Sequence, residues 1–181
     1  MKLAGYAEES IVDGPGVRCV IFFQGCRHHC PFCQNPQTWT FDGGTEVSLE
    51  SVDSEFDRIK ENTSGVTLSG GDPFCSLDDA IEVAKLAKRK YGFNVLAFTG
   101  YTLEELLEKG KGDERYMTLL SYLDVLIDGR FIMALRSIYI NNRGSMNQRC
   151  IDVRKTLKDG KIHLVESMMD MSFYDFERPE F

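Results

Sequence analysis

Short apolar runs alternate with amphipathic stretches along this chain. Residues 17–23 are almost continuously apolar, and such a run predicts a strand buried on both faces, as in the parallel sheets of α/β proteins. Shorter runs of the same kind predict further strands. These are expected over residues 66–68, 94–98, 124–127, 150–153 and 162–165.

Helices are predicted between the first strands, because apolar residues there recur every three or four positions. Leu49, Val52 and Phe56 form such a stripe after Ser48, a favourable N-cap. Capping-box sequences begin two further helices after Ser76 and Thr102. The expected helices cover residues 49–61, 77–91, a short stretch from 103 and residues 114–122.

Strand, polar loop and helix follow one another at least four times, which predicts parallel βαβ units with right-handed crossovers. In such folds ligands bind at the carboxyl ends of the strands. Each of these strands is followed by an unusual polar or cysteine-bearing loop, so we expect four loops to converge on one site. They are residues 25–34, 69–73, 99–101 and 128–131.

Half of the six cysteines lie in the first of these loops, at Cys26, Cys30 and Cys33. Soft thiolate ligands select zinc or iron-sulfur clusters. A structural zinc site or an ordinary 4Fe-4S cluster takes four protein ligands, so three cysteines suggest a cluster with one iron left open for another ligand. The less favoured alternative is a zinc site whose fourth ligand would be His28, His29 or Cys75.

Composition narrows the classes of function. The 181 residues predict a single domain over residues 1–181, and a net charge of -7 with a pI near 5.0 argues against a nucleic-acid surface. No apolar run approaches the ~20 residues that cross a membrane, and the first residues do not resemble a signal peptide. We therefore expect a cytoplasmic protein with free or metal-bound thiols. The tail, residues 166–181, would pack as a surface strap or contact a partner.

The spacing of Cys26, Cys30 and Cys33 resembles the cluster loop of the radical S-adenosylmethionine enzymes. In that family the three cysteines hold three irons of a 4Fe-4S cluster, and the fourth iron takes the amino and carboxylate groups of S-adenosylmethionine. The stretch Gly70-Gly71-Asp72-Pro73 resembles the family's contact to the methionine ammonium group. Bare glycine backbone would let a ligand approach closely, and a carboxylate can receive an ammonium group.

This resemblance implies an α/β fold, an incomplete β/α barrel of parallel strands, and a set of site residues. The cofactor-binding residues would be Phe32, Cys33, Gln34, Gly70, Gly71, Asp72 and Thr99, and the metal ligands Cys26, Cys30 and Cys33. Phe32 stands where the family often has an aromatic residue near the adenine. The cofactors carry the chemistry, so no catalytic acid or base is assigned.

Other stretches resemble narrower groups. Residues 13–18 are similar to the glycyl-radical activating enzymes, and residues 99–101, 128–131 and 143–149 are similar to the activating proteins of anaerobic ribonucleoside-triphosphate reductase. Activators of the formate-lyase type carry Asp-Thr-Asn-Gly after the third strand and a lysine in the fourth. Phe98-Thr99-Gly100-Tyr101 and Arg130 stand there instead, so ribose and carboxylate contacts at these positions stay open.

The activity that the resemblance implies is reductive cleavage of S-adenosylmethionine to methionine and a 5′-deoxyadenosyl radical, which removes hydrogen from a glycine of the large reductase subunit. A low-potential electron donor such as flavodoxin or ferredoxin would supply the electron. Two alternatives remain: a radical enzyme acting on a small molecule, similar to a deazapurine-forming synthase, which should lack the 143–149 stretch, and a zinc-binding interaction module.

The remaining cysteines, histidines and lysines have structural interpretations. Cys19 and Cys150 lie in apolar strands and are expected in the core. The charged run over residues 85–90 is expected on a solvated helix face. Cys75 and His163 are interpreted as structural, His28 and His29 as facing solvent, and a cation held by Thr99 and Asp128 is left open.

Overall fold

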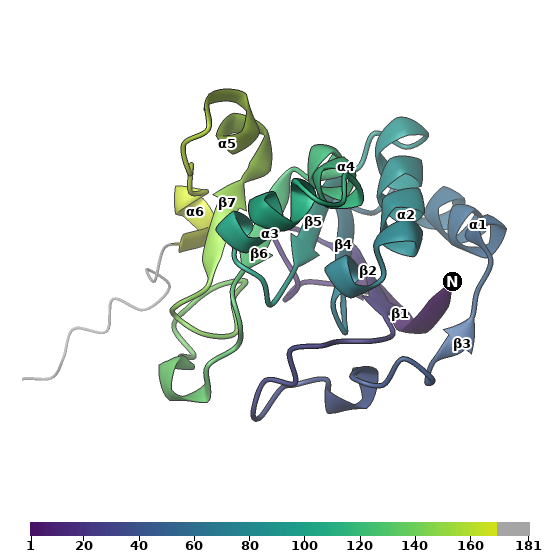
Figure 1. Ribbon diagram of the computed structural model, residues 1–181. Coiled ribbons are helices and arrows are strands. Elements are labelled where there is room, and N and C mark those ends of the chain that lie inside the picture. The colour runs from purple at the N-terminus through teal and green to yellow at the C-terminus, as the bar shows by residue number, and fades with distance from the viewer. Residues whose placement is uncertain (170–181) are drawn as a thin grey trace, which may run out of the picture.

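The apolar run predicted as the first buried strand forms β2 (Arg18–Phe23), near the centre of a seven-stranded sheet. The structure is a computed structural model that describes residues 1–169 (Figure 1). The strand order is β3-β1-β2-β4-β5-β6-β7. The other strands are β1 (Lys2–Ser10), β3 (Thr45–Glu46), β4 (Gly65–Gly70), β5 (Asn94–Phe98), β6 (Val125–Asp128) and β7 (Arg149–Asp152).

The centre and the edges of this sheet differ in direction. Strands β2, β4, β5 and β6 are parallel to one another, whereas β1, β3 and β7 pair in antiparallel fashion. Because β3 and β7 are the two outer strands, the sheet stays open. The predicted α/β class with a core of parallel strands is confirmed, and the antiparallel edges were not anticipated.

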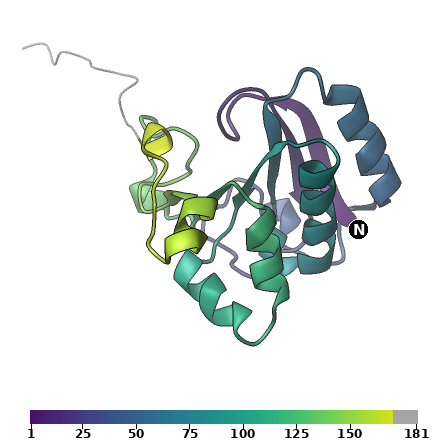
Figure 2. The ribbon, with the colours of Figure 1, turned by 90° about the horizontal axis from the view of Figure 1, so that it is seen from above.

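Helices α1 (Leu49–Ile59), α2 (Leu77–Arg89) and α4 (Arg115–Tyr122) cover one face of the sheet (Figure 2). Their apolar side chains, such as Phe56 and Val83, join those of the strands in the main core. On the opposite face, Leu96, Ile127 and Cys150 form a smaller core cluster with Met168. The shorter helices are α3 (Leu103–Gly110), α5 (Val153–Asp159) and α6 (Glu166–Met169), with 3-10 turns at Pro36–Thr38, Pro73–Cys75 and Met133–Leu135.

Two of the three predicted helix starts have the expected caps. The hydroxyl of Ser48 accepts a hydrogen bond from Ser51 N at 3.2 Å, and Thr102 forms a complete capping box with Glu105. Ser76 does not cap α2. Its hydroxyl donates instead to the carbonyl of Gln24 at 3.2 Å, so this serine ties α2 to the segment that follows β2.

Two strand predictions need correction. The predicted strand over residues 162–165 is a single bridge between Ile151 and Leu164, because Ile162 and Leu164 stay more than 40% exposed and gain little from pairing. Strand β1 was not predicted, since it lies near an edge and alternates weakly between buried and exposed positions. A strand with little buried surface leaves a weak signal in the sequence.

Some side chains depart from their expected surroundings. Lys88, expected in solvent, pairs with Asp124 at 2.5 Å and is largely buried. His163 pairs with Asp159 at 2.8 Å on the surface. Within residues 1–169, every helix is too short or too polar to span a lipid bilayer. The first residues of the tail form α6, with Met168 buried, and residues 170–181 lie outside the described part.

Candidate metal and cofactor site

A pocket of about 810 Å³ lies at the carboxyl ends of the parallel strands. The loops after β2, β4, β5 and β6 all contribute to its wall, as the topology predicted. Their lining residues are Cys26, His28, Cys30, Cys33 and Gln34 from the cysteine loop, and 69–71, 98–100, 129 and 131 from the others. Residues 11–16 and 140–144 line it as well.

The cysteine loop is held by backbone hydrogen bonds to the segment that follows it. Gly25 N donates to Thr38 O at 2.8 Å, and Cys26 N donates to Trp39 O at 3.1 Å. Within the loop, Cys33 N donates to Cys30 O at 3.0 Å. These bonds curl the chain so that the three cysteines face one pocket.

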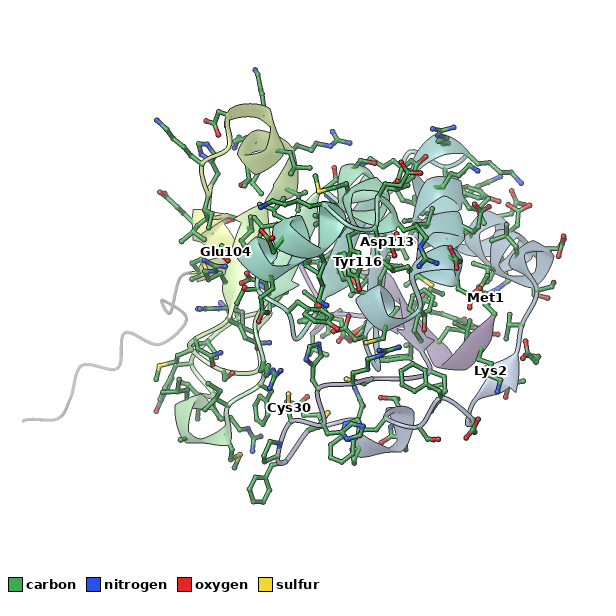
Figure 3. All side chains as sticks on the ribbon, in the orientation of Figure 1. Met1, Lys2, Cys30, Glu104, Asp113 and Tyr116 are labelled. Atoms are coloured by element: carbon green, nitrogen blue, oxygen red, sulfur yellow. The ribbon has the colours of Figure 1, made fainter. Side chains whose placement is uncertain are left out.

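Several contacts make this loop suitable for sulfur ligands. The sulfur of Cys26 accepts a hydrogen bond from His28 N at 3.5 Å, and that of Cys33 accepts one from Asn35 N at 3.4 Å. Burial raises the pKa values of Cys26 and Cys30. At Cys30 a hydrogen bond from the backbone N–H of Phe131 acts in the other direction and lowers the pKa of the thiol. Cys30 lies in the loop below the sheet (Figure 3). The loop after β6 therefore contacts the cysteine loop directly.

The donor set fits a 4Fe-4S cluster with one open iron. Three sulfurs line one pocket, and each of them faces a backbone N–H group, as cluster sulfurs do. Among residues 1–169, no three His, Cys, Asp or Glu side chains converge closely enough to hold a single metal ion. Each cysteine of a 4Fe-4S cluster binds its own iron, so a cluster requires no such common point.

Gly70 and Gly71 are required by backbone packing. A Cβ on Gly70, which has a φ of +98°, would lie 2.4 Å from the backbone nitrogen of Phe23, and one on Gly71 would lie 2.2 Å from the carbonyl oxygen of Gly25. Gly71 N also donates to Phe23 O at 2.8 Å. Both glycines line the pocket. Their lack of side chains allows this loop to pack against the start of the cysteine loop.

Asp72 is buried at a junction of three loops, with 1% of its surface exposed. One carboxylate oxygen accepts hydrogen bonds from His28 Nε2 at 2.8 Å, from Thr99 Oγ1 at 2.9 Å and from Gly100 N at 2.9 Å. The other oxygen accepts from Phe74 N at 2.9 Å. Thr99 and Gly100 line the pocket, whereas Asp72 stands behind them. A contact of Asp72 with an ammonium group stays a prediction.

The expectation that His28 faces solvent is wrong. Its side chain is 4% exposed, and its ring packs edge-on against Tyr101 at a centroid distance of 4.4 Å. His29 is exposed, as expected, and its ring also stacks on Trp39 at a centroid distance of 4.9 Å. Sequence reasoning missed His28, although a histidine between two ligand cysteines could have suggested a role inside the pocket.

The other predicted residues divide between the pocket and its surroundings. Gln34 and Thr99 line the pocket. Phe32 is 76% exposed and has a positive φ of 61°, so its side chain stands outside the pocket wall. Cys19 and Cys150 are buried in the core, as predicted. Cys75 is half-buried, and burial raises its pKa to about 12.

Asp128, the last residue of β6, pairs with an arginine, unlike Asp72. Its carboxylate accepts hydrogen bonds from Leu103 N at 2.8 Å and from Arg149 Nε at 3.0 Å, and it also pairs with Arg149 Nη2. The same guanidinium bonds Glu104, labelled in Figure 3, at 2.7 and 3.0 Å, which lowers the pKa of Glu104 to about 2. Asp128 is therefore occupied by a side-chain cation.

The contacts of Arg18 and Gly14 give residues 13–18 a structural role next to the pocket. The buried guanidinium of Arg18 donates to Thr67 Oγ1 at 2.7 Å and to Val66 O at 2.8 Å. Gly14, with a φ of +133°, passes so close that a Cβ would lie 2.6 Å from Arg18 Cδ. Gly14 lets the loop pass over the arginine, and Gly16 lets it pack against Ser64, so that residues 11–16 line the pocket.

Comparison with known proteins agrees with this site. The 4Fe-4S single cluster domain family matches residues 12–151. The anaerobic ribonucleoside-triphosphate reductase-activating protein of Vibrio cholerae is 35% identical over 154 residues, which cover 82% of this chain and 96% of that protein. The pyruvate formate-lyase-activating enzyme of Clostridium pasteurianum is 37% identical over 105 residues, 54% of this chain and 44% of that protein.

A solved structure, that of QueE from Escherichia coli, matches 56% of this chain and 53% of its own with a TM-score of 0.42 and 18% sequence identity. A similarity this low carries no argument about fold or activity. The function is therefore inferred from the sequence relatives and from the geometry of the pocket.

Proposed function

The chain belongs to the 4Fe-4S single cluster domain family and to the anaerobic ribonucleoside-triphosphate reductase-activating proteins, and from this premise we propose that it is a radical S-adenosylmethionine activase. It cleaves S-adenosylmethionine reductively at a 4Fe-4S cluster and generates the glycyl radical on anaerobic ribonucleoside-triphosphate reductase. One observation carries the proposal: three cysteines of one loop share a pocket with the loops that end β4, β5 and β6.

The cysteine loop holds the cluster in this proposal. Cys26, Cys30 and Cys33 would each hold one iron, which would leave one iron open to bind S-adenosylmethionine. When bound, the cluster supplies the electron that cleaves S-adenosylmethionine. The electron comes from a low-potential donor such as flavodoxin or ferredoxin, and the enzyme works in the cytoplasm.

The residues that line the pocket bind and orient S-adenosylmethionine and shield it from water. Gln34, Gly70, Gly71 and Thr99 contact S-adenosylmethionine along the wall that they line, and Phe32, outside that wall, is the aromatic residue expected near the adenine. Asp72 receives the ammonium group or, through its bonds to Thr99 and Gly100, positions the residues that do. Residues 11–16 and 140–144 exclude water from two other sides.

The test is anaerobic reconstitution with iron and sulfide, followed by mixing with S-adenosylmethionine, a strong reductant and the reductase. We expect brown protein, 5′-deoxyadenosine and a glycine-centred doublet in the electron paramagnetic resonance (EPR) spectrum. Single alanine variants of Cys26, Cys30 and Cys33 should lose all three signals. Cys75→Ser is the matched control, because this cysteine is also shielded from solvent but stands outside the proposed ligand set.

Two outcomes would contradict the proposal. Colourless protein that binds zinc tightly through the loop cysteines and forms no 5′-deoxyadenosine would favour an interaction module. Turnover with a small molecule such as a deazapurine precursor, without any doublet on the reductase, would favour a radical enzyme of a different substrate class.

A further inference from the structure

Two buried side-chain nitrogens in residues 1–169 have no hydrogen-bond partner: Trp39 Nε1 and Arg143 Nε. Both residues line the pocket that contains the three cysteines. Buried donors in folded proteins are almost always paired, so each exception calls for an explanation. Both exceptions belong to residues of this pocket wall, so a ligand with hydrogen-bond acceptors could supply the missing partners.

The two donors differ in their surroundings. Arg143 belongs to the loop before β7, and its other nitrogens are engaged, with Nη1 donating to Gln148 O and Nη2 to Met169 O, both at 3.1 Å. Those bonds alone give this side chain a structural role. The side chain of Trp39 has no second polar atom, since an indole can only donate through Nε1.

Trp39 is held firmly beside the cysteine loop. Its carbonyl oxygen accepts the hydrogen bond from Cys26 N at 3.1 Å, and its own backbone N–H donates to Pro36 O at 3.3 Å. Its ring stacks on His29 with an interplanar angle of 24°. The residue is therefore fixed by its backbone to one ligand cysteine and by its ring to the neighbour of another.

We propose that Trp39 Nε1 donates a hydrogen bond to a sulfur of the cluster, either a bridging sulfide or a cysteine ligand, and thereby raises the reduction potential of the cluster. The inference rests on the proposed function, because it needs the cluster in this pocket. Reduction adds negative charge to the sulfurs, so a donor stabilises the reduced form more than the oxidised form. Trp39 lines the pocket together with Cys26, Cys30 and Cys33, and it also borders a second cavity with Cys26, so cysteine sulfur is the acceptor common to its surroundings.

The chain allows an unusually clean test, because Trp39 is its only tryptophan. Replacing all tryptophan by β-(3-benzothienyl)alanine during expression changes one atom group, N–H to S, at one position. We expect unchanged iron and sulfide content and a reduction equilibrium shifted about tenfold toward the oxidised cluster, a decrease of about 59 mV for one electron. Trp39→Phe should shift it in the same direction.

A second measurement uses the unmodified protein. With ¹⁵N-indole tryptophan, the reduced cluster should show a hyperfine coupling to one nitrogen and to one exchangeable proton. An unchanged potential in the analogue protein, together with no such coupling in the labelled protein, would overturn the inference. If the unlabelled protein forms no iron-sulfur cluster at all, the proposed function fails first, and the two failures are thus distinguished.

Discussion

Two buried carboxylates lie at the ends of strands in the same sheet, and they have opposite surroundings. Asp72 follows β4 and accepts hydrogen bonds from a hydroxyl, two backbone N–H groups and the ring of His28. Asp128 ends β6 and pairs with the guanidinium of Arg149. Each is 1% exposed.

The difference separates two uses of a buried charge. The bonds of Asp72 connect the cysteine loop, its own loop and the loop after β5, all of which line the pocket. The pair at Asp128 joins β6 to the antiparallel edge strand β7 and, through Leu103, to the start of α3. We therefore expect changes at Asp72 to affect cofactor binding and changes at Asp128 to affect stability.

The largest expected loss of stability comes from Asp128→Asn. The variant removes the buried charge that faces a partly exposed guanidinium, and breaking a buried ion pair costs up to about 3 kcal/mol. Denaturant unfolding followed by circular dichroism would measure it, with reconstituted iron content as the parallel readout. A variant as stable as the unaltered protein would contradict a structural role for this pair.

Asp72→Asn should lower the stability less than Asp128→Asn does, and it should weaken S-adenosylmethionine binding more. The amide offers one acceptor oxygen where the carboxylate has two, so either Phe74 N or the three donors on the other side lose their acceptor, and an unpaired buried donor costs about 2 kcal/mol. We expect S-adenosylmethionine to bind about tenfold more weakly while iron loading persists, the equivalent of roughly 1.4 kcal/mol. The change that S-adenosylmethionine causes in the EPR spectrum of the reduced cluster would report this.

Asp128→Asn is the matched control for that experiment, because it makes the same chemical change at an equally buried position. If the two variants weaken S-adenosylmethionine binding equally, the division of roles between the two carboxylates is wrong.

The smallest expected effect belongs to Glu104→Gln, which removes the exposed partner of Arg149. An exposed ion pair contributes less than about 1 kcal/mol at neutral pH. The pKa of Glu104 is lowered from 4.5 to about 2, so the contribution is present above pH 4.5 and is lost as the pH falls toward 2. The difference in unfolding free energy between the two proteins should therefore narrow over that interval. If the difference in unfolding free energy between the two proteins did not change with pH, the Glu104–Arg149 ion pair would be excluded as the cause of that difference.

Local patterns predicted much of the fold. The central strands were recognised because burial on both faces makes them almost continuously apolar, and the capping box at Thr102 needs only residues within one helical turn. The direction of β7 was not predicted, since an antiparallel edge strand and a parallel one can have the same short apolar sequence. Its pairing with β6 brings Arg149 to Asp128, 21 residues earlier.

The site divides in the same way. The sulfur ligands were recognised from a spacing within one loop, and rules of topology place that loop beside the other strand ends. The partners of Asp72 were not predictable in this way, because His28 lies 44 residues before it and Thr99 27 residues after it. Trp39 was visible as the single tryptophan, but only the folded chain reveals that its N–H is buried without an acceptor.

Residue spacing alone was enough to predict the cysteine loop, the order of strands and helices in the parallel core, and the end of the sheet at which ligands bind. These are consequences of short-range spacing and of the right-handed crossover. Which polar side chains line the pocket, and which stand behind it, became known only from the folded chain. Burial and hydrogen-bond partners are properties of surfaces brought together from distant parts of the chain, and no local pattern encodes them.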